Sequence, residues 1–151
     1  MAHTQNHLLG ITGYNHCMDL REIEFRAKEA LASTDDRLVA AYLFGSVARA
    51  TASATSDIDV GILFRTAPPG RLSDVRFGIE GLLERALGQT VQVVVLNQAP
   101  PDLIHRVLRD GRLLVDRDRA ARIRFEVRAR NEYFDLVPTL NRYRRRETAA
   151  P

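Results

Sequence analysis

Two apolar segments joined by a short polar connection constrain the fold of this chain more than any other feature. The first, residues 38–44, is apolar throughout and ends at a glycine followed by a serine, and the second covers residues 58–64. Apolar segments of this length, bounded by glycine or small polar residues, are typical of buried strands. We therefore expect a sheet to form around these two segments.

The second strand brings two acidic residues, Asp57 and Asp59, into one small region. Side chains two positions apart in a strand point to the same face, with Cα atoms about 7 Å apart at a rise of about 3.3 Å per residue. Two carboxylates at that separation raise each other's pKa unless a cation offsets their charge. Carboxylate oxygens favour Mg²⁺ or Mn²⁺, and Mg²⁺ is usually held by one or two carboxylates together with substrate phosphates. These residues therefore predict a site for Mg²⁺ or Mn²⁺.

Gly45 and Ser46 predict the phosphate side of the same site. A glycine at a strand end allows the backbone to approach a ligand closely, and the following residues 47–50 are expected to form a short helix. The amino end of a helix favours phosphate. A nucleotide would then lie between this turn and the two carboxylates.

The combination of Gly45-Ser46, ten intervening residues and Asp57-x-Asp59, with an apolar strand on either side, resembles the nucleotidyltransferase family related to DNA polymerase β. The similarity is greatest to the small, single-domain minimal nucleotidyltransferases, and it covers about residues 20–140. It implies that Asp57 and Asp59 are catalytic metal ligands. It also implies that ATP is the substrate and that an acceptor hydroxyl attacks its α-phosphorus, with pyrophosphate as the leaving group.

The resemblance also assigns nucleotide-binding residues, namely Gly45, Ser46, Arg49 and Ser56. A guanidinium at Arg49 could neutralise charge on the leaving phosphates. An ordinary solvated arginine is an equally good interpretation of that residue. Ala50 replaces a glycine that often follows the arginine in this family, which bears on the shape of the loop.

The third carboxylate of the family pattern is replaced by Gln92 in this chain. This position lies in the predicted strand 90–96, and its polar side chain within a β-branched segment is expected to face the site. An amide oxygen can coordinate a metal, but it carries no charge and cannot act as a base. Two hypotheses follow, either a slow enzyme in which water or a substrate phosphate acts as base, or a protein that keeps binding without catalysis.

The order of apolar segments predicts an α/β fold, a small mixed sheet of three to five strands with flanking helices. We expect a loosely ordered tail over residues 1–17 and a single nucleotidyltransferase domain over residues 18–147. The other predicted elements are helices over 19–33, 72–87, 101–110 and 116–147, and a peripheral strand over 112–115. Gly78 and Gly81 within the second of these helices predict close packing against a neighbour, and His105 is expected to be solvated.

The long C-terminal helix is apolar on more than one side, which predicts a protein interface. The partner could be a second copy of this chain or a different protein. Pro138 is expected to kink or break the helix.

Composition narrows the partners and the location of the protein. A net charge of +3 suits an anionic partner, but it is too small to indicate nucleic-acid binding by itself, so we expect none directly. Cys17 is the only cysteine and no apolar run approaches the roughly 18 residues of a membrane span, so we expect a cytoplasmic protein without a membrane.

The resemblance implies a biological role as well as a reaction. Minimal nucleotidyltransferases are often encoded beside a HEPN-domain protein, where they act as antitoxins. We therefore expect a metal-dependent transferase that moves AMP from ATP to a hydroxyl of a protein partner, a HEPN-type toxin. The alternative is a catalytically impaired protein of the same fold that neutralises the partner by binding, and a weaker one is an ATP sensor without transfer.

Overall fold

The structure, a computed structural model, describes residues 18–34, 36–53, 56–66 and 72–147, so the predicted tail 1–17 lies outside the described residues. The elements along the chain are α1 (Leu20–Ala32), β1 (Leu38–Phe44), α2 (Gly45–Ala48), β2 (Ile58–Phe64), α3 (Leu72–Leu87), β3 (Val91–Val95), the 3-10 helix η1 (Leu96–Gln98), α4 (Pro101–Asp110), β4 (Arg112–Asp116) and α5 (Arg119–Glu147). The predicted elements are all present, and their boundaries shift by a few residues. No helix in the described part of the chain is long and apolar enough to cross a membrane.

The sheet has four strands in the order β3-β2-β1-β4. β1 runs antiparallel to both of its neighbours, whereas β2 and β3 are parallel. A parallel pair needs a long crossover, and α3 supplies it. The mixed α/β sheet predicted from the sequence is therefore confirmed, and β4 is an edge strand as expected.

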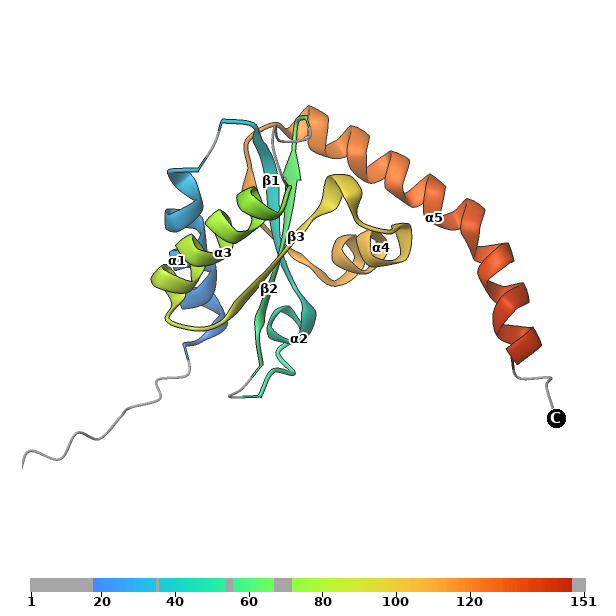
Figure 1. The fold of residues 1–151 in the computed structure, drawn as a ribbon, viewed down its shortest axis with the longest axis horizontal. Coiled ribbons are helices and arrows are strands. Elements are labelled where there is room, and N and C mark those ends of the chain that lie inside the picture. The colour runs from blue at the N-terminus through green and yellow to red at the C-terminus, as the bar shows by residue number, and fades with distance from the viewer. Residues whose placement is uncertain (1–17, 35, 54–55, 67–71, 148–151) are drawn as a thin grey trace, which may run out of the picture.

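Helices cover both faces of the sheet (Figure 1). α1 and α3 lie on one face, over a core that includes Leu43, Ile58 and Leu83. α4, η1 and the first half of α5 lie on the other face, around Leu96, Val107 and Phe125. The second half of α5 extends beyond the sheet (Figure 1). The candidate site lies at the carboxyl end of β1 and the amino end of β2.

The free edge of β3 is closed by carboxylates of α3. The N–H of Val93 donates to Glu80 Oε1 at 3.0 Å, and the N–H of Val91 donates to Glu84 Oε1 at 3.2 Å. An edge strand otherwise presents unpaired N–H groups that favour pairing with other chains. These two glutamates therefore protect the strand that carries Gln92.

α5 is anchored to the sheet by a chain of polar side chains. The Tyr42 hydroxyl donates to Glu126 Oε1 at 2.9 Å, and the Arg122 guanidinium donates to Glu126 at 2.7 Å and to Asp116 at 2.9 Å. Burial, followed by the hydrogen bond and charge of Glu126, raises the pKa of Tyr42 well above its ordinary value. This network joins β1, β4 and α5, and it sets the direction in which α5 leaves the domain.

α5 differs from the sequence prediction in two ways. It begins at Arg119 because β4 continues to Asp116, and it continues through Pro138 without a break. A proline inside a helix removes one intrahelical hydrogen bond, and its ring clashes with the preceding turn, so it kinks or breaks the helix. The predicted break is absent, whereas the change of direction of α5 in its second half (Figure 1) agrees with the predicted kink.

The position of His105 off the apolar stripe suggested a solvated side chain, but in the structure this side chain makes aromatic contacts. Its ring stacks on Tyr133 of α5, with centroids 3.8 Å apart and an angle of 4° between the planes. Phe134 meets the edge of both rings. The pair joins α4 to α5, a contact between distant segments that helical periodicity could not predict.

Gly78 and Gly81 do not mark close packing, which corrects the prediction made for them. A Cβ at Gly78 would meet no atom within 4 Å, and one at Gly81 would meet only the end of the Arg85 side chain at 3.3 Å. A glycine in an exposed helix interior costs about 1 kcal/mol relative to alanine. We therefore expect Gly78→Ala to raise the free energy of unfolding by up to about 1 kcal/mol, measured by urea denaturation.

Gly88, just after the same helix, is the matched control. Its φ is +64°, and its N–H donates to the carbonyl of Glu84 at 2.8 Å. A side chain is disfavoured in this left-handed conformation, so Gly88→Ala is expected to lower stability by about 1 kcal/mol. An equal change of the same sign in both variants would contradict this account.

Candidate functional site

The turn after β1 lies directly against the Asp59 carboxylate. Phe44, the last residue of β1, is paired with Asp59 across the antiparallel ladder. Gly45 follows with φ +74°, and a Cβ on it would lie 2.0 Å from Asp59 Oδ2. This position therefore excludes any side chain, both by conformation and by space. The Gly45 backbone and the Asp59 carboxylate form the centre of the candidate site.

The loop that follows folds back on Ser46. The helix α2 spans Gly45–Ala48, so the predicted short helix over residues 47–50 is displaced toward the glycine. The Ser46 carbonyl accepts from the N–H of Thr51 at 2.9 Å and from its hydroxyl at 3.3 Å. Ala50 has φ +56°, a conformation that favours glycine. The glycine common at this position in the family thus has a conformational reason, and Ala50 adopts the same backbone at a cost.

Asp57 and Asp59 differ in their surroundings. Asp57 is exposed and lies one residue before β2, whereas Asp59 is partly buried within it. Burial, followed by the charge of Asp57, raises the pKa of Asp59, and the charge of Arg49 opposes this shift. The two carboxylates therefore interact, as the sequence predicted, and Asp59 is destabilised in its ionised form.

Arg49 lies near two acidic residues of the folded chain. Its charge lowers the pKa of Asp59 and, after the larger effect of the Arg109 hydrogen bond, contributes to lowering the pKa of Asp110 at the end of α4. Sequence reasoning did not include Asp110, because no local pattern connects it with the loop. The charge of Arg49 therefore acts on both carboxylates, and its predicted contact with phosphate stays a prediction.

Ser56 has local partners in the loop before Asp57. Its hydroxyl accepts from the N–H of Ser53 at 2.9 Å and lies 3.1 Å from the Ser53 hydroxyl. These contacts hold the end of the loop that leads into β2. The predicted contact of Ser56 with a nucleotide stays a prediction.

Gln92 lies beside Asp59 on the neighbouring strand. The two residues are paired in the parallel register of β2 and β3, so their side chains lie on the same face about 5 Å apart at the backbone. Gln92 is exposed on that face. The orientation expected for the third-carboxylate position is therefore present, without its charge.

The side chains at this site can supply oxygen ligands to one small divalent cation. They do not form the cluster of three acids that the family pattern contains. Asp57 and Asp59 supply carboxylate oxygens and Gln92 supplies an amide oxygen in register with one of them. Within residues 18–34, 36–53, 56–66 and 72–147, no group of three or more His, Cys, Asp or Glu side chains could hold a metal. Mg²⁺ that completes its shell with water and substrate phosphates suits such an incomplete donor set.

The raised pKa of Asp59 predicts how stability depends on pH. A carboxyl whose pKa is higher in the folded state binds more protons there, so its contribution to stability falls as pH rises through these pKa values. Without divalent cations, Asp59→Asn is therefore expected to melt at a higher temperature than the wild type at about pH 7. This advantage should shrink toward about pH 3, where the wild-type carboxyl is also neutral. An advantage that stays constant over this range in EDTA would contradict the assignment.

The chain belongs to the polymerase β nucleotidyltransferase family, because the profile of that family matches residues 27–120, more than half of the sequence. The matched region contains the Gly45-Ser46 and Asp57-x-Asp59 elements that carry the resemblance. No curated protein sequence matches the chain significantly.

Solved structures with the same fold include parts of toxin–antitoxin complexes. One chain of a toxin–antitoxin complex with AMP-PNP is 25% identical and superimposes with a TM-score of 0.72, over 83% of this chain and 98% of that one. A chain of the complex between a tri-AMPylated HEPN toxin of Shewanella oneidensis and its MNT antitoxin is 22% identical, with a TM-score of 0.69 over 86% and 99% of the two chains. A protein described as a minimal nucleotidyltransferase is 30% identical over 64% of this chain and 97% of its own, with a TM-score of 0.53.

Proposed function

We propose that this protein is a metal-dependent nucleotidyltransferase that moves AMP from ATP to a hydroxyl group of a protein partner, as the antitoxin of a HEPN/MNT toxin–antitoxin pair. The observation that carries the proposal is the close approach of the Gly45 turn to Asp59, where a Cβ would lie 2.0 Å from the carboxylate. A protein that acted by contact alone would have no need to hold a glycine turn against the Asp59 carboxylate.

The reaction requires that one phosphorus–oxygen bond forms and another breaks. The acceptor hydroxyl oxygen attacks the α-phosphorus of ATP, the bond to the β-phosphate breaks, and pyrophosphate leaves with the negative charge. We assign Gly45 and Ser46 to contact the triphosphate and Arg49 to neutralise the leaving phosphates, since its charge already acts on the site. The proton of the acceptor passes to water or to a substrate phosphate, because Gln92 cannot accept it.

Asp57 and Asp59 are the residues that would hold Mg²⁺ or Mn²⁺, with Gln92 as a neutral neighbour. A divalent cation there would offset the phosphate charge and lower the pKa of the acceptor hydroxyl. In its absence the mutual repulsion of the two carboxylates and the burial of Asp59 disfavour the ionised pair. The site is thus arranged so that cation binding relieves an existing electrostatic cost.

Two of the similar solved structures support the proposal that this chain binds a nucleotide and a protein partner. A similar chain comes from a complex solved with AMP-PNP, and another from a complex in which the HEPN toxin carries AMP groups. By analogy, we infer that this chain binds ATP and acts on or with a HEPN-type protein. α5 extends beyond the sheet and offers surface for such a partner (Figure 1).

One observation favours the alternative of a binding protein without catalysis. Gln92 lies in register with Asp59 at the position of the third carboxylate, and its loss of charge weakens metal binding and removes the base. In this alternative, the chain would neutralise its partner by contact. The carboxylates of Asp57 and Asp59 would then take part in ATP binding or have no function.

Transfer of label from α-labelled ATP distinguishes the two functions. The assay contains Mg²⁺ or Mn²⁺, this protein, and the protein encoded beside it, and it follows label on each chain. Label that appears on a protein and disappears in the Asp57→Asn variant is the result expected. Tight binding of the neighbouring protein with no label on either chain would instead establish the binding function.

A further inference from the structure

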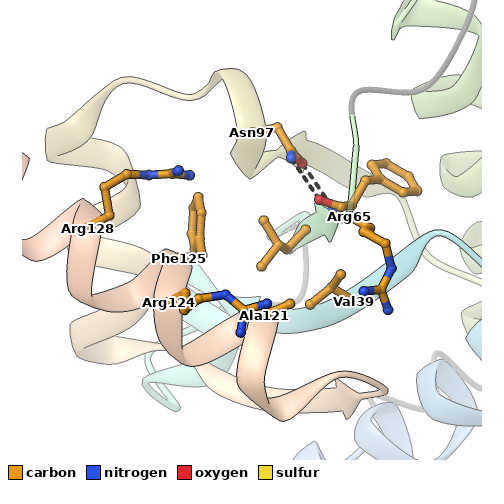
Figure 2. A pocket seen from close by; sticks show the side chains of 9 residues that line it. Val39, Arg65, Asn97, Ala121, Arg124, Phe125 and Arg128 are labelled. Atoms are coloured by element: carbon orange, nitrogen blue, oxygen red, sulfur yellow. Dashed lines mark hydrogen bonds between the residues drawn. The ribbon is translucent and has the colours of Figure 1, made fainter.

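A hollow lined by arginines lies at the opposite end of the sheet from the candidate site. Its volume is about 260 Å³, and α5, η1 and the ends of β1 and β2 surround it (Figure 2). The lining residues that matter here are Arg65, Asn97, Arg124, Phe125 and Arg128. Val39, also in the wall, is five residues along β1 from the partner of Asp59, about 16 Å at about 3.3 Å per residue. The hollow is therefore separate from the nucleotide site.

The hollow carries more positive charge than its own acids offset. Arg65 is paired with Asp118 at 2.8 Å. Arg124 forms no ion pair among the described residues, and Arg128 is 3.8 Å from Glu132 where both side chains are exposed, a contact that contributes little. The Arg128 guanidinium lies 5.9 Å from the centre of the Phe125 ring and points into the hollow (Figure 2). Two guanidinium groups are thus available to an anionic group.

An exposed apolar row on α5 runs next to this hollow. Ile123, Val127 and Phe134 are 42%, 50% and 61% exposed, and we call them the outer row. Their spacing of four and seven residues places them on one side of the helix, opposite the side on which Phe125 and Ala129 are buried. Arg124 and Arg128 lie between these two sides. A row of exposed apolar side chains, bordered by one arginine without an ion pair among the described residues and one with a weak, exposed ion pair, is typical of a protein interface.

We propose that the hollow and the outer row form one docking surface for an acidic, partly apolar segment of a partner protein. A carboxylate of the partner would enter the hollow and pair with Arg124 and Arg128, while its apolar side chains cover the outer row. A guanidinium pairs with a carboxylate through parallel hydrogen bonds, which gives the contact direction as well as charge. This proposal deepens the proposed function, on which it rests, by specifying where the partner binds and what chemistry it presents.

Charge and polarity decide between possible occupants. A second copy of this chain would bring the same arginines against one another, which disfavours a symmetric dimer through this surface. A nucleic acid would satisfy the arginines but would leave the outer row against phosphates and sugars. An acidic apolar segment satisfies both parts.

The test compares charge reversals on the two sides of the sheet. The Arg124→Glu/Arg128→Glu variant is compared with Arg21→Glu/Arg85→Glu, whose exposed arginines lie on α1 and α3 and give the same change in net charge. Affinity for the HEPN-domain protein encoded beside this chain is measured by calorimetry at physiological salt. We expect the first variant to bind at least about tenfold more weakly and the control to bind within about twofold. The Ile123→Ser/Val127→Ser variant, which changes only exposed side chains, should also weaken binding without a loss of thermal stability.

The outcomes separate this proposal from the proposed function. Asp57→Asn should abolish label transfer and leave the affinity for the partner unchanged. If the wild type itself transfers no label but its binding is weakened by the arginine variant as expected, only the enzymatic function is overturned. Equal affinity of wild type and the arginine variant, or no binding by the wild type, would overturn the docking surface. The docking surface would also be overturned if the arginine variant bound the partner protein as tightly as the wild type but no longer bound a labelled single-stranded RNA. The same holds if its only change were to be a monomer where the wild type is a dimer.

Discussion

The Gly45→Ala variant is expected to lose AMP transfer by about a hundredfold or more, because its Cβ would lie 2.0 Å from Asp59 Oδ2. The carboxylate cannot stay where it is, and a displacement of about 1 Å at a reacting centre is enough for a loss of this size. Backbone strain adds a cost of about 1–2 kcal/mol in stability, since φ at this residue is +74°. Both effects come from one methyl group at one position.

Gly88→Ala is the control that isolates the two effects. It places a side chain on a similar backbone, with φ +64°, but a Cβ there meets nothing within 4 Å. Both variants should lose comparable stability in urea denaturation, whereas only Gly45→Ala should lose label transfer from α-labelled ATP. Full activity of a folded Gly45→Ala protein would show that the close contact with Asp59 is unimportant for the reaction.

Gln92→Asp is expected to raise the rate of AMP transfer by about a hundredfold or more, the lower end of what a positioned base contributes. The new carboxylate would lie in register with Asp59 and on the same face. It would add a charged metal ligand and a proton acceptor to a site that has two acids. Because a third negative charge lies close to Asp59, the variant should also be less stable than the wild type in EDTA and gain more stability from Mg²⁺.

Gln92→Asn distinguishes the effect of charge from that of side-chain length. Asparagine has the length of aspartate without its charge, so this variant should show neither the higher rate nor the stronger dependence on Mg²⁺. Rates and melting temperatures measured over a range of Mg²⁺ concentrations report both effects. If Gln92→Asp and Gln92→Asn behave alike, the missing carboxylate does not limit the reaction.

Much of the site was predictable because its parts are local in sequence. The apolar segments 38–44 and 58–64 indicate strands, and a glycine between strand and loop indicates a tight turn. The alternation from Asp57 into β2 predicted that Asp57 and Asp59 share one face. The orientation of Gln92 was predicted from its polar side chain within a β-branched segment and from the resemblance to the family, and the parallel register of β2 and β3 agrees with that prediction.

Features that depend on distant contacts were missed or wrong. Gly78 was expected to pack closely, but helical spacing does not reveal that none of the described elements covers that side of α3. His105 was expected to be solvated, and its partner Tyr133 comes from a helix that begins after another strand. The hollow beside Arg124 and Arg128 had no signature in the sequence, because its wall combines β1, β2, η1 and α5.

Local patterns in the sequence were enough to predict the elements of this protein and its family and to propose the residues of its candidate site, because each depends on side chains within a few positions of one another. Only the tertiary structure decided which side of each helix is covered and how the elements meet. The antiparallel ladder brings Gly45 against Asp59, and the bonds from Tyr42 and Arg122 to Glu126 direct α5 away from the sheet. Packing between distant segments minimises the exposed apolar area of the whole chain, which no local pattern specifies.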